Sequence, residues 1–366
     1  MGTTMRLFIL RFAVLFFISL VMVFSCSLFV RAIEVGSIPQ QVEDKYLPDG
    51  DDVDVKPWIG GLEIPWSLIF LPDGRALVSE RPGRIRLIKN GNLASEPYAT
   101  LTVTSEGEGG LMGLAMHPNF PREPYIYAMH TYTVKGKLYN KVIRLKDNGT
   151  KGIYDRDIID NILGGKSHDG GRIAFGPDSM LYITTGETFQ GDLAQDLSLL
   201  NGKILRITPE GAIPKDNPFR NSPVWSYGHR NPQGIAWHPV TKDLFISEHG
   251  PTGESLVFGH DEINVVKKGG NYGWPKVVAA VSQKAFIDPI IVWRKATPPA
   301  GITFYIKGPM SHLTNDLFVA TLKSRALIRI RLKPESGSYK ILEIHRWFTT
   351  GEKQSRYGRL RDVVQG

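Results

Sequence analysis

The sequence predicts an all-β protein, and three observations support this class. Glycine and proline are abundant, with 38 and 24 residues, as expected where many short strands are joined by tight turns. Apolar strands alternate with Pro/Asp/Gly turns along the chain, and almost no helical periodicity lies between them. The composition, with 42% hydrophobic and 22% charged residues, is that of an ordinary globular protein.

A strand–turn–strand phrase recurs and refines this prediction. Its copies begin at Ser67, Gly113, Arg172, Gly234 and, in a weaker form, Gly301. Such a unit cannot bury both faces of its sheet alone, so neighbouring units must stack around a central channel. Repeats of roughly 45 to 75 residues with this content indicate a β-propeller.

The last residues, Arg361–Gly366, look like the first strand of another copy. We therefore expect a six-bladed β-propeller over residues 57–366 that lacks the closing strands of its last blade. Such a gap would leave an exposed sheet edge.

The N-terminal region has a different character. Arg6 and Arg11 precede an uncharged run from Phe12 to Val30, which is long enough for a membrane helix. A small-residue cleavage site ends at Ala32, so residues 1–32 are either a signal peptide or a membrane anchor. Both alternatives imply export, to the periplasm or another extracytoplasmic space. Residues 33–56 are acidic and lack an apolar period, which predicts a solvated linker.

Cysteine content and charge exclude several classes. Cys26, the only cysteine, lies in the N-terminal segment, so the globular part has no disulfide, thiol nucleophile or cysteine-based metal site. The net charge of +8 comes from scattered lysines and arginines, with no basic tract and no aromatic RNA-binding motif. Nucleic acid is therefore not an expected partner.

Polar residues concentrate where strands meet loops, which is where a scaffold presents its working groups. His168, in the loop Ser167–Arg172, has the side chain best suited to accept a proton near neutral pH. Arg230, in Tyr227–Gly234, could hold a carboxylate or quinone oxygen through paired donors. Composition alone also permits both stretches to be plain surface loops.

Two further groups suggest ligands. Gly250 and Pro251 are followed by carboxylates, and oxygen ligands of this kind suit Ca²⁺ rather than zinc. Lys323, Arg359 and Arg361 come late in the chain. We expect Arg359 and Arg361 to alternate on one strand and share a face, where they need either solvent or an acidic ligand.

Taken in order, these phrases resemble the PQQ-dependent soluble aldose sugar dehydrogenases of the glucose/sorbosone dehydrogenase family. The resemblance covers roughly residues 58 to 366. The matching segments are Pro65–Ser67, Glu108–Gly113, His168–Arg172, Tyr227–Gln233, Glu248–Pro251, Asp261–Asn264 and Gly269–Pro275.

The resemblance implies catalytic roles. His168 matches the general base that takes the proton of the anomeric hydroxyl while hydride passes to the quinone. Arg230 matches the arginine beside the reacting quinone carbonyl. Glu187 stands where relatives usually carry an Asp that orients the base, and its side chain is one methylene longer.

The resemblance also implies ligand contacts. PQQ is a tricarboxylate, and Asn231, Lys323, Arg359 and Arg361 match its contacts, as does Arg230. Gly250 and Pro251 match the backbone carbonyl ligands of the Ca²⁺ that polarises PQQ, and Glu262 and Tyr272 match a second, structural Ca²⁺ site. One departure is an insertion at residues 252–260, between the two groups of calcium ligands.

The implied function is oxidation of an aldose at C1 to the lactone, with electrons leaving through PQQ to an external acceptor. A non-catalytic exported propeller that binds a partner or glycan is the main alternative. A Ca²⁺-dependent hydrolase or lactonase is a third reading, but it does not explain the late cations.

Overall fold

Consecutive strands form five antiparallel sheets in the computed structural model, which describes residues 32–50, 53–351 and 355–366. Each sheet is one blade, and we number the blades in chain order. The strands of blade 1 are β3 (Pro65–Phe70), β4 (Ala76–Glu80), β5 (Arg84–Lys89), β6 (Asn92–Leu93) and β7 (Ala99–Thr100). Those of blade 2 are β8 (Leu111–Met116), β9 (Tyr125–Val134), β10 (Lys137–Asp147) and β11 (Gly152–Leu163).

The remaining blades repeat this order. Blade 3 contains β12 (Ile173–Phe175), β13 (Leu181–Thr185), β14 (Lys203–Ile207) and β15 (Val224–Tyr227). Blade 4 contains β16 (Pro232–Trp237), β17 (Leu244–Glu248), β18 (Asp261–Val266) and β20 (Ile291–Trp293). Blade 5 contains β21 (Pro299–Phe304), β22 (Leu317–Thr321), β23 (Leu327–Glu335) and β24 (Ser338–Trp347). The described helical turns are η1 (Gly191–Gln195), η2 (Glu254–Leu256) and η3 (Ser311–Leu313).

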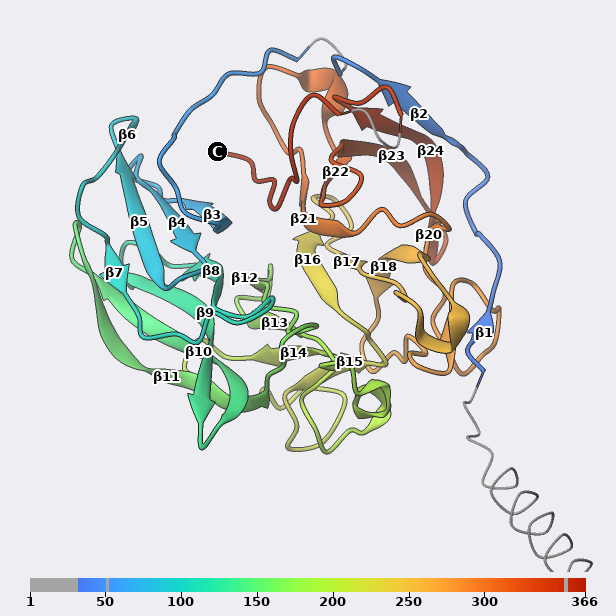
Figure 1. Ribbon diagram of the computed structural model, residues 1–366, viewed down its shortest axis with the longest axis horizontal. Coiled ribbons are helices and arrows are strands. Elements are labelled where there is room, and N and C mark those ends of the chain that lie inside the picture. The colour runs from blue at the N-terminus through green and yellow to red at the C-terminus, as the bar shows by residue number, and fades with distance from the viewer. Residues whose placement is uncertain (1–31, 51–52, 352–354) are drawn as a thin grey trace, which may run out of the picture. The chain divides into compact units, whose positions relative to one another are not determined.

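The blades surround a common centre, and the predicted propeller arrangement is confirmed. In Figure 1 the first strand of each blade lies innermost, and β3, β8, β12, β16 and β21 follow one another around the centre. Buried apolar side chains fill the spaces between blades 1 and 2, 2 and 3, 3 and 4, and 4 and 5. These shared cores stabilise the ring because each blade buries its sheet faces only against its neighbours.

The expectation of six blades is wrong for the described residues, which hold five. Residues 361–366, expected to begin a sixth blade, form no strand. They lie between β21 and β3 (Figure 1): Gly301 N–H donates to Arg361 O over 3.1 Å, and Leu68 N–H donates to the Asp362 carboxylate over 3.2 Å. Because single contacts to each side replace a ladder of backbone hydrogen bonds, this segment does not become a strand.

Residues 33–47 also differ from the predicted solvated linker. Within them, β1 (Glu34–Val35) pairs with β19 (Val277–Val278), and β2 (Asp44–Leu47) pairs in parallel with β24. The reason is that edge pairing uses backbone groups and needs no apolar period in the sequence. The prediction for residues 1–32 falls almost wholly outside the described residues. Among the residues that are described, no helix is long and apolar enough to cross a membrane.

We expect Asp362→Ala to destabilise the protein by about 3 kcal/mol or more, because it leaves a buried cation without its partner. Asp362 accepts a hydrogen bond of 2.9 Å from Arg172 Nη1, and the Arg172 side chain is only 8% exposed. Urea unfolding of the protein without ligand measures the loss. Asp49→Ala is the control, since its ion pair with Arg356 is exposed and its loss should change the unfolding free energy little. Equal stabilities of the two variants would contradict the buried role of Asp362.

Candidate active site

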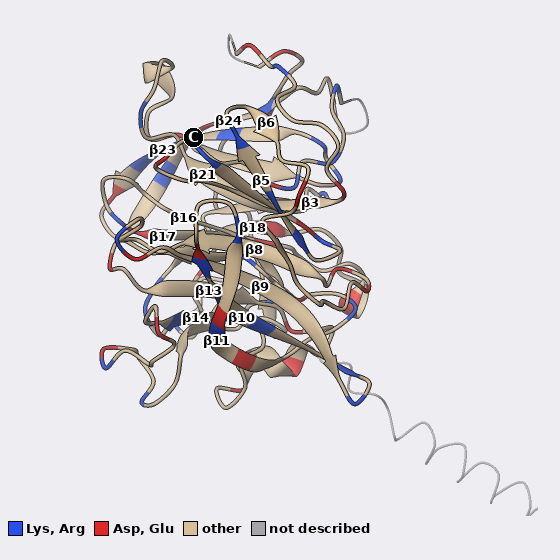
Figure 2. Cartoon of the chain, turned by 90° about the vertical axis from the view of Figure 1, so that its left-hand side faces the viewer, with Lys and Arg blue, Asp and Glu red and all other residues tan. Residues whose placement is uncertain are grey.

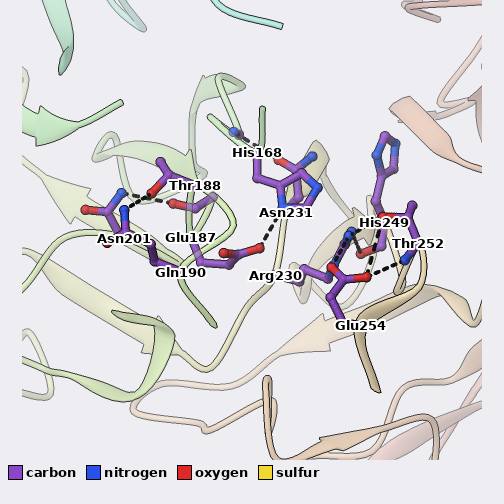
Figure 3. Close-up of polar contacts among 12 residues, drawn as sticks. His168, Glu187, Thr188, Gln190, Asn201, Arg230, Asn231, His249, Thr252 and Glu254 are labelled. Carbon is purple, nitrogen blue, oxygen red and sulfur yellow. Dashed lines mark hydrogen bonds and ion pairs between the residues drawn. The ribbon is translucent and has the colours of Figure 1, made fainter. Parts of the chain in front are cut away.

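The polar loops singled out from the sequence meet at one end of blades 3 and 4. The inner strands β12 and β16 start at this end, and the antiparallel strands β13 and β17 finish there. The loops before β12 and β16 therefore lie beside the loops after β13 and β17. Figure 3 shows the resulting group of side chains, with His168 and Glu187 near Arg230.

His168 and Glu187 form a buried pair at this end. The imidazole Nδ1 lies 2.6 Å from Glu187 Oε1, and the two side chains are 5% and 1% exposed. A carboxylate only accepts hydrogen bonds, so Nδ1 carries the proton and the Nε2 lone pair of the neutral imidazole is left to act as a base. Glu108 Oε2 also accepts the backbone N–H of His168 over 2.9 Å. The longer side chain of Glu187 thus reaches the imidazole.

The backbone around this pair is strained. His168, Thr188 and Phe189 all have left-handed backbone angles, with φ of 60°, 56° and 60°. Gly186 is required beside them, since a Cβ there would stand 2.0 Å from the carbonyl oxygen of His168. Such angles persist only where the surrounding structure enforces them, often at functional sites. They bring the Phe189 ring onto the imidazole at a centroid distance of 3.9 Å while 56% of Phe189 remains exposed.

Arg230 is almost fully buried next to this pair. Its guanidinium donates to Glu254 Oε1 from Nε over 2.9 Å and from Nη2 over 2.5 Å. Nη2 also donates to Thr252 Oγ1 over 3.1 Å. The backbone N–H of Arg230 donates to Glu248, which fixes the start of β16 against the end of β17.

His249 sits among the cations of this region. Burial, with the charges of Arg361 and Arg230, lowers the pKa of His249 to about 3. Its imidazole is therefore neutral at physiological pH, and Nε2 donates to the carbonyl oxygen of Pro299 over 2.9 Å. This contact joins the loop after β17 to the start of blade 5.

Asn231 presents an unused donor. Its Oδ1 accepts hydrogen bonds of 3.0 Å from the Gly170 N–H and from Gln233 Nε2. Its Nδ2 is buried and has no partner among the described residues. Because buried donors are normally satisfied, this atom fits a site that receives an acceptor from a ligand.

The late cations are only partly brought together. Arg361 Nη1 donates to Gln233 Oε1 over 3.3 Å, and its guanidinium lies 5.6 Å from the Trp66 ring. The Arg172 guanidinium lies over the same ring at 4.4 Å, and its Nη2 has no partner among the described residues. Burial and the charge of Arg172 lower the pKa of Arg361 to about 10, as expected for a cation that lacks an anion.

Arg359 and Lys323 are exposed, but Arg359 lines the same cavity as Trp66 and Arg361. The predicted strand that placed Arg359 and Arg361 on one face does not form, so that argument is wrong. Arg359 borders an open cavity of about 450 Å³ that also includes Trp66. Lys323 borders a different cavity of about 690 Å³, between the 252–260 loop and blade 5.

The residues expected to bind calcium surround a small cavity of about 20 Å³. Burial, reinforced by the nearby Glu248 carboxylate, raises the pKa of Glu262 to about 8. Asn264 Nδ2 lies 3.1 Å from Glu262 Oε2 and 3.5 Å from Glu248 Oε2. Two buried carboxylates this close fit a divalent cation, which would relieve their repulsion.

The other expected calcium ligands line the same cavity. Gly250 and Pro251 lie on it, but the Pro251 carbonyl already accepts the Gly259 N–H over 2.9 Å. The Tyr272 hydroxyl donates to Val265 O and accepts from Lys267 N–H, both over 2.8 Å. Only the backbone carbonyl of Tyr272 is therefore left as a calcium ligand.

These observations also test whether the site fits PQQ. Arg230 and Arg172 supply buried positive charge, the half-buried Arg361 adds a third cation, and the unpartnered Asn231 Nδ2 and Arg172 Nη2 supply free donors. A planar tricarboxylate quinone needs these two properties in a pocket. The residues present fit the group.

Asp169, next to His168, makes the stability pH-dependent. Burial raises its pKa from 3.8 to about 6. Its Oδ1 accepts from Asn140 Nδ2 over 2.8 Å and from the Gly165 N–H over 3.0 Å, while its Oδ2 has no partner among the described residues. Because the folded state keeps this proton to higher pH than the unfolded state, stability falls as pH rises from about 4 to about 6.

Asp169→Asn removes this dependence, since the amide stays neutral at every pH. We expect the variant to be more stable than the parent protein by up to about 3 kcal/mol at pH 8, and similar to it at pH 4. Denaturant unfolding of the ligand-free proteins across this pH range measures the difference. An unchanged pH profile would contradict a buried, protonated Asp169.

Sequence reasoning missed two residues that touch the predicted catalytic groups. Phe189 covers His168, and Glu254 pairs with Arg230. Phe189 lies two residues after Glu187, but nothing in the sequence shows that its ring turns back onto His168. Glu254 lies in the insertion, which the sequence indicates only as a departure from relatives.

Figure 2 shows lysine and arginine positions interspersed with aspartate and glutamate positions along the described elements.

Comparison with known proteins gives a consistent result. The profile of the family described as "Glucose / Sorbosone dehydrogenase" matches residues 62–366. The chain is 32% identical over 330 residues to the aldose sugar dehydrogenase YliI of Escherichia coli K12, covering 83% of this chain and 85% of that protein.

Two solved structures are similar. The PQQ-bound aldose sugar dehydrogenase of Streptomyces coelicolor has 35% identity and a TM-score of 0.70, with 84% of this chain and 87% of that chain covered. An oxidoreductase of Thermus thermophilus, described as a glucose dehydrogenase, has 48% identity and a TM-score of 0.77, with 84% and 89% covered. The match over most of the chain shows that this protein belongs to the glucose/sorbosone dehydrogenase family.

Proposed function

We propose that this protein oxidises an aldose at C1 to the lactone, with PQQ and Ca²⁺ as cofactors and an external electron acceptor. The observation that carries the proposal is the buried pair of His168 and Glu187 beside a cluster of cations and unpartnered donors. Sugar oxidation needs such a base, and a tricarboxylate needs such cations.

Each side chain of the site has a separate role in the proposed reaction. Glu187 holds the proton on Nδ1 of His168, so Nε2 can take the proton of the anomeric hydroxyl. PQQ, when bound, supplies a quinone that accepts the hydride from C1. Arg230 lies where it can stabilise negative charge developing near the base. Phe189 shields one face of the imidazole from water.

Cofactor contacts are proposed for four other residues. Asn231 offers its unpartnered Nδ2, and Arg361 offers a half-buried guanidinium. Lys323 and Arg359 are exposed, so their side chains would have to extend toward the ligand. For calcium we propose the carbonyl oxygens of Gly250 and Pro251 as ligands.

Glu262 and Tyr272 line the same cavity as Gly250 and Pro251, and we propose them as the further calcium ligands there. The Glu262 carboxylate and the Tyr272 carbonyl would supply ligands, and the adjacent Glu248 adds negative charge. Calcium prefers oxygen donors of this kind.

Export is also proposed, because Arg6 and Arg11 precede the apolar run of the N-terminal segment. Cell fractionation of a tagged full-length chain would test this part.

The direct test is reconstitution. Purified protein is mixed with PQQ and Ca²⁺, and reduction of an artificial dye is followed with glucose and other aldoses. Dye reduction that requires sugar, PQQ and Ca²⁺ is expected. A folded protein that neither binds PQQ nor reduces the dye would contradict the proposal, and glycan binding without dye reduction would favour the non-catalytic alternative.

A further inference from the structure

The guanidinium of Arg230 is already occupied by the chain itself. Glu254 Oε1 accepts from Nε and from Nη2, and Thr252 Oγ1 accepts from Nη2. Nη1 donates to the carbonyl oxygen of His249 over 3.3 Å. The edge of the arginine that would hold an anionic ligand therefore carries a carboxylate from the 252–260 insertion (Figure 3).

The two partners of this ion pair differ in burial. The Arg230 side chain is 2% exposed, whereas that of Glu254 is 26% exposed. A buried cation needs an anion close by, but a half-buried carboxylate can be taken up by water. Burial raises the pKa of Glu254, but the charge of Arg230 and its hydrogen bonds outweigh this effect and lower the pKa below its usual value, so Glu254 is present as the carboxylate. Glu254 can leave the pair more easily than Arg230 can.

The loop that carries Glu254 is lightly anchored. Leu256 and Phe258 are 89% and 61% exposed, and the half-buried Val257 between them is the apolar residue of this loop that packs against the core, in the cluster with Trp274. Ser255 and Leu256 have left-handed φ angles of 49° and 64°. Few buried apolar contacts mean a low free-energy cost of local rearrangement, and left-handed angles in non-glycine residues add strain that a rearrangement can release.

We propose that Glu254 is an internal counter-ion that occupies Arg230 in the empty site and exchanges with an oxygen atom of the anionic cofactor. The proposal rests on the proposed function, because it takes PQQ as the incoming anion. Glu254 thereby sets the affinity of the site: it neutralises Arg230 when no ligand is bound and competes with the ligand for it. Binding moves Glu254 into solvent, and no covalent bond changes.

Titration of the protein with PQQ in the presence of Ca²⁺, followed by fluorescence quenching, tests the exchange. Glu254→Gln keeps a hydrogen-bond acceptor but removes the competing charge, and charge-assisted hydrogen bonds are about twice as strong as neutral ones. We expect the Kd for PQQ to fall by roughly tenfold. Glu254→Asp, whose side chain is one methylene shorter, should give an intermediate Kd.

Glu210→Gln is the matched control, because it makes the same change of charge at an exposed turn between β14 and β15. Its Kd should equal that of the parent protein, which separates local competition from net charge. A Kd for Glu254→Gln equal to or higher than that of the parent protein would overturn the exchange while leaving the proposed function intact. Absence of PQQ binding in all the proteins would overturn both.

Discussion

Replacement of His168 by asparagine is expected to lower aldose turnover by about 10²–10⁴-fold while PQQ remains bound. The imidazole is the base that takes the anomeric proton, and Glu187 fixes the tautomer that makes Nε2 the acceptor. An amide of similar size cannot accept this proton. Rates with saturating sugar and a separate titration with PQQ measure the two effects independently.

Asparagine is the appropriate substitution because His168 has a φ of 60°. Asparagine tolerates this left-handed backbone better than most residues, so the loop should keep its shape. His168→Ala provides a second variant, and His312→Ala, at an exposed position in η3, is the control. Comparable turnover in His168→Asn and the parent protein would refute the assignment of the base.

Replacement of Arg230 by alanine is expected to lower turnover by about 10²–10³-fold, the usual cost of removing one donor that stabilises developing negative charge. PQQ binding should weaken as well, because a buried cation is lost from the site. Steady-state rates and PQQ titration give both quantities.

Two further variants make this result specific. Arg230→Lys keeps the charge but loses the planar pair of donors, so it should recover part of the PQQ affinity and little of the turnover. Arg356→Ala removes an exposed arginine and should change neither. Full activity of Arg230→Ala would show that this guanidinium takes no part in the reaction.

The local pattern of strands and turns in the sequence determined the fold class. A strand–turn–strand phrase begins at Ser67 and recurs at Gly113, Arg172 and Gly234. Repeated units of this kind have few ways to bury the faces of their sheets. The number of blades could not be predicted from this repeat. Arg361–Gly366 has the residues of an inner strand, but it has no partner strand among the described residues to complete its hydrogen bonds. The acidic segment 33–47 was likewise not recognised as strands that pair with β19 and with blade 5, because backbone pairing leaves no periodic signal in the sequence.

For the candidate site too, the sequence determined some features and the tertiary structure determined others. The sequence by itself determined which residue types are available, because His168, Glu187, Arg230 and Glu262 lie in recognisable phrases at the ends of strands. Only the tertiary structure decided which of them meet: it brings Glu187 onto His168, leaves Lys323 and Arg359 exposed, and turns Glu254 onto Arg230. These contacts join residues from different loops whose paths depend on packing between blades, and a one-dimensional pattern does not contain that information.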